Sequence, residues 1–388
     1  MKLVIFGRNK EIARIELYEV LSRMSIRFSL DYEEDRYWII SCEDETNINF
    51  HEIIQNLAGT LRIVDIKQVL HTIHDLDLEQ WDLYLPKKYN YAISETGLNE
   101  EERDIVTEHA KAFAKNTNSK AIFKNPKSSG KERLIDPSSY ISWNLEDGVE
   151  YVYFKSKDGD IYSGVTEGCG NTKIFKMLDT HLPARRFTHG TSFRVARMMM
   201  NILDLKENQT LADPFCGTGT FLIEGLLQRL NVIGIDNDSE LVNDSKQNLH
   251  WLKNEFEINN SSEVILGDAK KTEFVADGVI FEPYMGPFLK NIPSIKEAKY
   301  IWNELNDLYN ETFANLSMNL KLGNKVVCIL PDIPSTSGEI FKLDEKVFES
   351  NGFMYTSLPS FLKTSAKIKY DTPDGSKIIR HVYILEKV

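Results

Sequence analysis

An acidic residue and two glycines stand between an apolar strand and a helix near the middle of the sequence. Asp213 ends the strand Leu211–Asp213, the loop that follows contains Gly217 and Gly219, and apolar spacing predicts a helix over Phe221–Leu230. Glycines let a backbone approach a ligand closely, and a helix N-terminus favours a negative group such as a carboxylate. The loop lacks the lysine of a phosphate-binding P-loop and the three-glycine spacing of the dinucleotide fingerprint. The segment therefore predicts a ligand site of another kind.

Two more acidic residues end the next two predicted strands. Asp236 ends the strand Asn231–Asp236, where its carboxylate can accept from both hydroxyls of a ribose and would repel a 2′-phosphate. The strand Val264–Leu266 leads to Asp268, which can accept from the amino group of an adenine. Taken alone, each of these acidic residues would be read as an ordinary surface residue. Three strand ends in order, each suited to one part of the ligand, predict a site for an adenosine compound with a free ribose.

A fourth predicted strand, Asp277–Phe281, runs into the segment Glu282-Pro283-Tyr284. Enzymes that methylate an exocyclic base amine usually carry Asp or Asn, then two prolines, then an aromatic residue at this place. The polar side chain and a backbone carbonyl accept hydrogen bonds from the amine, and the aromatic ring stacks on the extruded base. Such acceptors orient the nitrogen lone pair and stabilise the charge that develops on nitrogen. This chemistry requires no metal.

The fourth segment departs from that pattern. Aligning Pro283-Tyr284 with the usual proline and aromatic residue puts Phe281 where the acid should be, whereas treating Glu282 as the acid requires the loss of one proline. We favour Glu282 as the acceptor because phenylalanine offers none. Two alternatives stay open, an enzyme with an altered substrate position and a binding protein that has lost catalysis.

These segments together resemble a known family. Asp213–Thr220, Asp236 and Asp268 are similar to the successive S-adenosylmethionine motifs of the Rossmann-like class I methyltransferases. The residue pattern of Asp213–Thr220 resembles that of the branch that modifies bases in RNA. The stretch Leu182–Arg197 resembles the one that precedes the first motif in archaeal and eukaryotic tRNA guanine-10 N2-methyltransferases.

The resemblance implies a role for each matching residue. Asp213, Gly217 and Gly219 would flank the methionine part of S-adenosylmethionine, Asp236 would hold the ribose, and Asp268 the adenine. The residues implied to line the rest of the cofactor site are Phe215, Asn237, Ala269, Thr191 and Ser192. Those implied to act in catalysis are Glu282, Pro283 and Tyr284. No metal is expected, and a partner subunit is left open.

The order of predicted elements gives an α/β protein with three units. Residues 1–60 read as a small α+β unit, ferredoxin-like by the resemblance, and residues 61–165 as a THUMP-like RNA-binding domain. Regular alternation of strands and helices follows in residues 166–388, the methyltransferase domain with a doubly wound sheet. The strands Lys367–Tyr370 and Ile378–Leu385, joined by turn residues, predict an antiparallel hairpin at one edge of that sheet.

The net charge of −12 argues against a protein that binds nucleic acid over its whole surface. Two local basic segments could bind RNA instead, although each could equally be a solvated face. The residues expected to contact RNA are Lys120, Lys124, Lys127, Lys131, Arg133, Arg185 and Arg186. The substrate expected from the resemblance is tRNA.

Composition places few other limits on the chain. Its hydrophobic share of 42% and charged share of 27% are those of soluble globular proteins, without an apolar run of membrane-spanning length. The first residues, Met1–Gly7, read as a strand rather than a signal peptide, so we expect a cytoplasmic protein. The 4 cysteines lack the paired spacings of a zinc site and of a disulfide framework.

Three functions compete at this point. The first is methylation of a guanine N2 amine in tRNA, at position 10 by the resemblance. The second is methylation of a base amine in DNA or ribosomal RNA, because the fourth segment suits an amine and not a particular polymer. The third is RNA binding without catalysis by a protein that retains the cofactor pocket. The long N-terminal half favours the first, since a small substrate would not require it.

Overall fold

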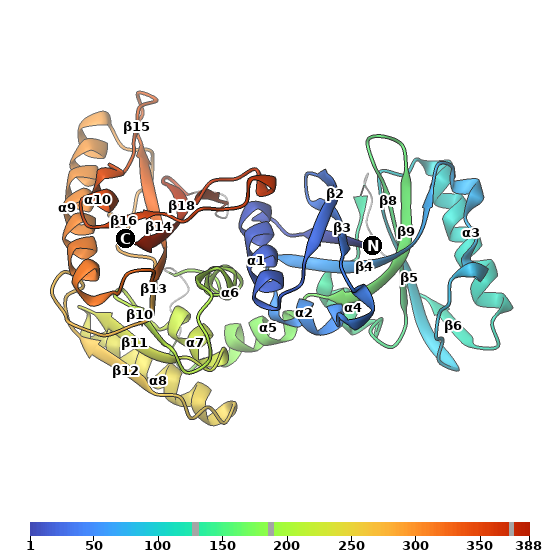
Figure 1. Cartoon of the computed structure of the whole chain (residues 1–388), viewed down its shortest axis with the longest axis horizontal. Coiled ribbons are helices and arrows are strands. Elements are labelled where there is room, and N and C mark those ends of the chain that lie inside the picture. Colours follow the sequence, from blue (N-terminus) through green and yellow to red (C-terminus); the bar gives the residue numbers. More distant parts are fainter. Residues whose placement is uncertain (126–131, 185–189, 372–375) are drawn as a thin grey trace. The chain divides into compact units, whose positions relative to one another are not determined.

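The structure is a computed structural model that describes residues 1–125, 132–184, 190–371 and 376–388 (Figure 1). It forms two compact units: Met1–Lys10 with Met24–Ile174, and Glu11–Arg23 with Phe175–Val388. Among the predicted RNA contacts, Lys127, Lys131, Arg185 and Arg186 lie outside the described residues. None of the helices in the described ranges is both long and apolar enough to cross a membrane.

The first unit is built on a 9-stranded sheet in the order β2-β3-β1-β4-β9-β8-β5-β6, with β7 paired to β5. Its strands are β1 (Lys2–Phe6), β2 (Phe28–Glu34), β3 (Tyr37–Cys42), β4 (Thr60–Leu70), β5 (Lys88–Thr96), β6 (Lys120–Phe123), β7 (Glu132–Arg133), β8 (Val149–Lys155) and β9 (Ile161–Cys169). Its helices are α2 (Phe50–Asn56), α3 (Glu100–Asn116) and α4 (Pro137–Ser142). Because β4 pairs with both β1 and β9, the sheet is continuous across residue 60. The predicted ferredoxin-like and THUMP-like divisions stay predictions.

A buried polar network joins the middle strands of this sheet. Arg62 and Glu150 are 3% and 1% exposed, and the Arg62 Nε donates to a Glu150 carboxylate oxygen at 2.7 Å. The hydroxyls of Ser94 and Thr166 also donate to Glu150, at 2.5 Å and 2.6 Å. Breaking a buried ion pair on one side leaves an uncompensated charge, which costs about 3–5 kcal/mol. The network therefore fixes β4, β5, β8 and β9 in one register.

The second unit contains a 9-stranded sheet in the order β12-β11-β10-β13-β14-β18-β16, with β15 on β14 and β17 on β18. Its strands are β10 (Thr210–Asp213), β11 (Asn231–Asp236), β12 (Ser262–Leu266), β13 (Gly278–Phe281), β14 (Lys325–Pro334), β15 (Ile340–Phe341), β16 (Phe353–Tyr355), β17 (Lys367–Tyr370) and β18 (Ile379–Lys387). Strands β10 to β14 are parallel and β18 is antiparallel to β14. This confirms the predicted doubly wound sheet with an antiparallel edge.

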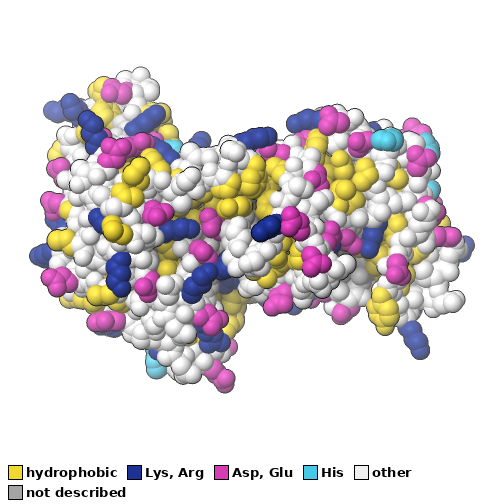
Figure 2. All heavy atoms as spheres, viewed as in Figure 1, with side chains coloured by type: hydrophobic (Ala, Val, Ile, Leu, Met, Phe, Trp, Pro, Cys, Tyr) yellow, Lys and Arg dark blue, Asp and Glu magenta, His cyan; other side chains and the backbone are white. Residues whose placement is uncertain are grey.

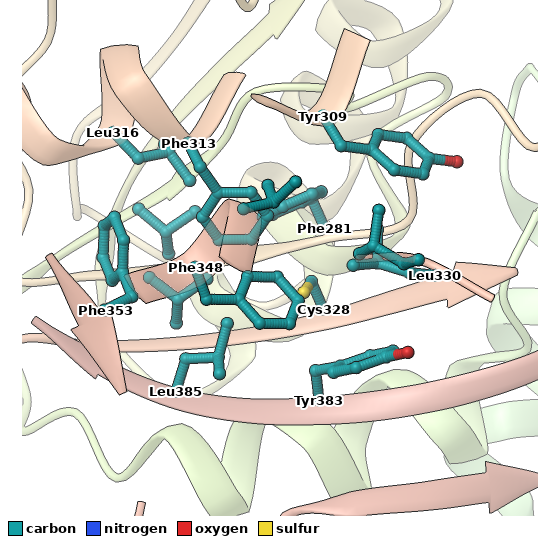
Figure 3. Packing of buried hydrophobic residues seen from close by; sticks show 14 of the residues in the cluster. Phe281, Tyr309, Phe313, Leu316, Cys328, Leu330, Phe348, Phe353, Tyr383 and Leu385 are labelled. Carbon is teal, nitrogen blue, oxygen red and sulfur yellow. The ribbon is translucent and has the colours of Figure 1, made fainter. Parts of the chain in front are cut away.

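The helices of the second unit cover both faces of its sheet. They are α1 (Lys10–Arg23), α5 (Thr172–His181), α6 (Phe193–Leu203), α7 (Thr220–Leu227), α8 (Ser239–Glu255), α9 (Ile295–Asn319) and α10 (Lys346–Glu349). Side chains alternate between the faces of a strand. Ala212 of β10 and Phe281 of β13 accordingly pack in one cluster with Phe313 of α9 and Phe348 of α10. Figure 3 shows the rings of Phe281, Phe313 and Phe348 gathered between α9 and the strands.

The opposite face of the sheet carries α7. A side chain added at Gly225 of α7 would meet Leu211 of β10 at 2.8 Å and Val232 of β11 at 2.9 Å. Helix α6 is tied to α7 by a buried ion pair in which the Arg197 Nε donates to Glu224 at 2.8 Å. Burial raises the pKa of the Glu224 carboxyl, while Arg197 opposes that rise. The segment that precedes α6 is therefore held beside this face.

Helix α1 packs within the second unit although it lies near residue 10 in the sequence. The Asn201 side chain donates to Glu16 at 2.7 Å, and Arg23 bonds to Asp204 at 3.2 Å. Glu16 is 0% exposed, as are five apolar side chains of α1, Ile12, Ala13, Ile15, Leu17 and Leu21. The predicted boundary of the first unit at residue 60 stays a prediction, while the compact units assign Glu11–Arg23 to the second.

Candidate active site

Three carboxylates lie on the α6 and α7 side of the second sheet. Asp213 shares the face of Leu211, and Asp236 shares the face of Val232, by the two-residue period of a strand. Glu282 follows Phe281, whose ring packs on the opposite, α9 side. Parallel strands bring their C-terminal ends to one edge of a sheet, where ligands bind in open α/β folds. The predicted acids Asp213, Asp236 and Glu282 are therefore brought together.

Asp213 is completely buried at the end of β10. One carboxylate oxygen accepts from the backbone N–H of Phe215 at 3.0 Å, and the other has no hydrogen-bond partner among the described residues. Burial raises the pKa of this carboxyl well above its usual value, and the charges of Asp236 and Glu282 raise it further, against the Phe215 hydrogen bond. A buried acceptor without a donor costs about 1–3 kcal/mol. Asp213 is therefore arranged for a donor or cation that none of the described residues provides.

The glycine loop is fixed by Asp236. One Asp236 oxygen accepts from the backbone N–H of Gly217 at 2.9 Å, and the other accepts from the N–H of Asp238 at 2.9 Å. Gly217 has a φ of 52°, and a side chain at this position would meet none of the described residues within 4 Å. Gly219 has a φ of 90° at the start of α7, and a Cβ there would lie 2.7 Å from the Ser245 hydroxyl. Both positions favour glycine.

The remaining predicted cofactor residues differ in how far they are exposed to solvent. Asp268 follows β12 and accepts from the N–H of Lys270 at 3.0 Å, and the Ala269 carbonyl accepts from Asn315 at 2.9 Å. The Phe215 ring is half-buried and stands 5.6 Å from that of Phe281. Asn237 is exposed, and Ser192 caps α6 by accepting from the Val195 N–H at 3.4 Å. Their contact with a cofactor stays a prediction.

Glu282 is held from two sides. The Thr191 hydroxyl donates to one of its carboxylate oxygens, and the Nε of Arg380 donates to the other at 3.2 Å. Thr191 stands just before α6, and Arg380 lies in the antiparallel strand β18. An ionised carboxylate has about four acceptor sites, so both oxygens can still accept from a substrate.

The two residues after Glu282 differ sharply in exposure. Pro283 is buried, whereas the Tyr284 side chain is 56% exposed. The Tyr284 carbonyl accepts from the hydroxyl of Tyr309 in α9 at 2.8 Å. The backbone is thus fixed while the ring is exposed, and stacking of a base on this ring stays a prediction.

Sequence reasoning did not identify Arg380 and Tyr309 as parts of this site. Arg380 could have been noticed as a charged residue in the mainly apolar strand Ile378–Leu385. The alternation of a strand puts its side chain on the face opposite that of Tyr383. The strand pairing of β14 with β18 brings Pro331 beside Arg380. No local pattern marks Tyr309, because its role depends on the path of the loop after β13.

The predicted RNA contacts that the structure describes lie in the first unit. Lys120 in β6 is exposed, Lys124 is half-buried, and Arg133 in β7 stands 3.6 Å from Glu95, which also pairs with Arg103 at 2.7 Å. On the face drawn in Figure 2, Lys and Arg side chains are interspersed with Asp and Glu side chains. RNA binding by these residues stays a prediction.

The charge of the site fits S-adenosylmethionine. The unpartnered oxygen of Asp213, with Asp236 and Glu282 near enough to raise its pKa, makes the site a concentration of negative charge. A sulfonium, an ammonium and ribose hydroxyls would supply the cation and the donors that the described residues do not give to this Asp213 oxygen. We therefore assign the cofactor of this site as S-adenosylmethionine, which supplies an electrophilic methyl group.

Comparison with known proteins also indicates a methyltransferase. Residues 184–332 match the family model UPF0020, an RMKL-like methyltransferase domain. The chain is 34% identical over 121 residues to a probable tRNA (guanine(10)-N2)-dimethyltransferase of Methanothermococcus thermolithotrophicus, covering 30% of this chain and 72% of that protein. It is 29% identical over 159 residues to the corresponding enzyme of Methanothermobacter thermautotrophicus, covering 39% of this chain and 43% of the relative. The chain thus spans less than half the length of this second relative.

Solved structures show the same fold over the whole chain. TrmN from Thermus thermophilus superposes with a TM-score of 0.55 at 13% identity, covering 100% of this chain and 99% of that one. The putative methyltransferase SMU.472, solved with SAH, gives 0.52 at 13% identity and covers 100% and 98%. Fold and site together define a Rossmann-like class I methyltransferase. Within that class, the protein belongs to the family of the archaeal tRNA (guanine(10)-N2)-dimethyltransferases.

Proposed function

We propose that this protein methylates the exocyclic N2 amine of a guanosine in tRNA, using S-adenosylmethionine. The observation that carries the proposal is the half-buried Glu282 carboxylate, held by Thr191 and Arg380 beside the cofactor acids Asp213 and Asp236. The archaeal relatives carry this activity in their names, which supports guanine N2 and tRNA as the substrate group and polymer. Position 10 is the nucleotide proposed from the same likeness.

Each residue of the site has a part in the proposed reaction. Glu282 accepts a hydrogen bond from the target amine, which turns the nitrogen lone pair toward the methyl donor and stabilises the positive charge that develops on nitrogen. Its carboxylate is oriented by Thr191 and Arg380 before the substrate arrives. The exposed Tyr284 ring provides a stacking surface for the base after it leaves the RNA helix.

The test compares the wild type with three variants on transfer RNA, by mass analysis of its nucleosides after incubation with labelled cofactor. Glu282→Gln keeps a carbonyl acceptor and loses the charge, whereas Glu282→Ala loses both, so activity should fall in the order wild type, Gln, Ala. Tyr284→Ala should also reduce turnover, because base stacking on an aromatic ring is worth about 1–3 kcal/mol. Cofactor affinity should change little in all three, since these side chains act on the base.

The wild type decides between this proposal and the two others. Methylation of DNA or ribosomal RNA but not tRNA would favour the second candidate function. Binding of tRNA and cofactor without any transfer would favour a noncatalytic protein. Wild-type activity in Glu282→Ala would show that another group accepts from the amine.

A further inference from the structure

The ion pair between Glu282 and Arg380 presents an ordered row of hydrogen-bonding groups at the candidate site. Arg380 donates through Nε to one Glu282 oxygen at 3.2 Å, and Thr191 donates to the other oxygen. The Nη1 of Arg380 donates to the Ser376 hydroxyl at 3.1 Å, which leaves Nη2 without a hydrogen-bond partner in the described part of the chain. The row therefore consists of two acceptors, the carboxylate oxygens of Glu282, followed by one donor, the Nη2 of Arg380.

That row is complementary to guanine. The Watson–Crick edge of guanine presents the N2 amine, the N1–H and the O6 carbonyl in sequence, which are donor, donor and acceptor. Resting on the proposed function, we propose that Arg380 is a specificity-determining residue, which donates to guanine O6 while Glu282 accepts from N1–H and from the N2 amine. One N2 hydrogen then points to Glu282, and the nitrogen lone pair is left for the methyl group.

Adenine would not satisfy the same row. Its Watson–Crick edge presents the N6 amine as donor and N1 as acceptor, so an adenine amine on Glu282 would put the N1 lone pair against a carboxylate and leave the guanidinium without an acceptor. A site built to bond polar substrate groups rejects an analogue that leaves its own groups unpaired.

The surroundings of the pair suit this role. The Arg380 side chain is 24% exposed and that of Glu282 is 16% exposed, so both are partly shielded from water yet accessible. Arg380 comes from β18, and the strand period places it on the side of the sheet opposite Tyr383, whose ring packs with Phe348 on the α9 and α10 side. Glu282 lies on that same opposite side, since Phe281 before it packs toward α9. A charged strand residue here contacts the catalytic loop rather than the hydrophobic core.

The experiment replaces the target guanosine with 2-aminopurine riboside in a tRNA assembled from two synthetic pieces, after the target position has been mapped with natural tRNA. 2-Aminopurine retains the amine at C2 and lacks both O6 and N1–H. The quantity measured is the ratio of kcat/KM on the guanosine tRNA to kcat/KM on the analogue. Arg380→Met should lower kcat/KM on guanosine by about ten- to hundredfold and change the analogue far less, because only guanosine offers O6. The ratio should therefore shrink in Arg380→Met.

Lys369→Met is the matched control, because it removes one exposed positive charge from β17, where Lys369 pairs with His381. This variant should leave the ratio at its wild-type value. An equal loss on both tRNAs in Arg380→Met would overturn the proposal and leave Arg380 a purely structural partner of Glu282. A wild type that does not methylate guanosine N2 would instead refute the proposed function.

A second measurement needs no variant. Replacing the target with 6-thioguanosine keeps N1–H and the N2 amine but puts a weaker acceptor at C6. Wild-type enzyme should methylate this tRNA more slowly than the guanosine tRNA. Equal rates would overturn the O6 contact even if Arg380→Met does not fold.

Discussion

At the scale of single residues, the site concentrates carboxylates where burial opposes their charge. Asp213 is fully buried with one oxygen unpartnered among the described residues, and Asp236 uses one of its acceptor sites on Gly217. Such an arrangement lowers the stability of the protein without its ligand and favours a ligand that brings positive charge and donors. Stability and cofactor binding therefore make opposite demands on Asp213.

Asp213→Asn tests this conflict through pH. The pKa of Asp213 is raised in the folded protein, so the folded state binds its proton more tightly than the unfolded state, and the stability of the wild type falls as pH rises through that window. The variant lacks this titration but keeps an oxygen for the Phe215 N–H. Its free energy of unfolding relative to wild type should therefore increase as pH rises above about 4, the ordinary pKa of an aspartate, by at most about 1.4 kcal/mol per pH unit.

Urea denaturation of both proteins at several pH values measures this difference, in which the titrations shared by the two proteins cancel. Calorimetry should show weaker binding of S-adenosylmethionine by the variant. A difference in stability that does not depend on pH would show that Asp213 titrates alike in the folded and unfolded states.

At the scale of elements, helix α9 supports both the core and the catalytic loop. Its Phe313 packs against Phe281 at a ring distance of 6.1 Å (Figure 3). One turn earlier in the helix, the Tyr309 hydroxyl donates to the Tyr284 carbonyl. A change in α9 packing is therefore transmitted to the loop that holds Glu282 and Tyr284. Burial raises the pKa of Tyr309 well above its ordinary value, so its hydroxyl stays a donor at physiological pH.

Tyr309→Phe removes this one hydrogen bond and keeps the ring. Stability should fall by about 0.5–1.5 kcal/mol, and kcat should fall while cofactor affinity is retained. The matched control is Tyr383→Phe, because the buried Tyr383 hydroxyl has no hydrogen-bond partner in the described part of the chain. Thermal unfolding and steady-state kinetics measure both variants, and equal effects in the two would assign the loss to the core rather than to the loop.

In the second unit the sequence predicted the strands around the candidate site and the closing hairpin, because these segments carry their own local signals, but it gave no prediction for α9 or β14. The glycine loop, the strand Asn231–Asp236 and the strand Lys367–Tyr370 carry their own periodicity and turn residues, and the structure reproduces the bounds of both strands. In the first unit the strands Phe28–Glu34, Thr60–Leu70 and Lys88–Thr96 were not predicted; charged residues interrupt the apolar alternation of the first two. The Arg380 contact was missed because strand pairing, which joins distant segments, determines it.

At the scale of the whole molecule, recognition of a large RNA is expected to involve the first unit. Replacing Lys124, Lys127 and Lys131 together should weaken tRNA binding and reduce its salt dependence by about one unit of slope for each phosphate that the protein no longer neutralises. The matched control replaces three exposed lysines of the second unit, Lys206, Lys246 and Lys321. Filter binding at several salt concentrations gives both slopes. If the salt dependence of tRNA binding falls only in the control variant, the phosphate-binding surface lies on the second unit.

Helix α1 also has a consequence for the order in which the protein folds. Its buried residues belong with the methyltransferase sheet, yet the segment Met24–Ile174 of the first unit separates them from Phe175 along the sequence. Joining such distant segments closes a long loop, whose entropic cost precedes any gain from packing, and non-local contacts of this kind slow folding. The catalytic unit is therefore a discontinuous domain, and an excised fragment that starts at Phe175 would lack a piece of its own hydrophobic interior.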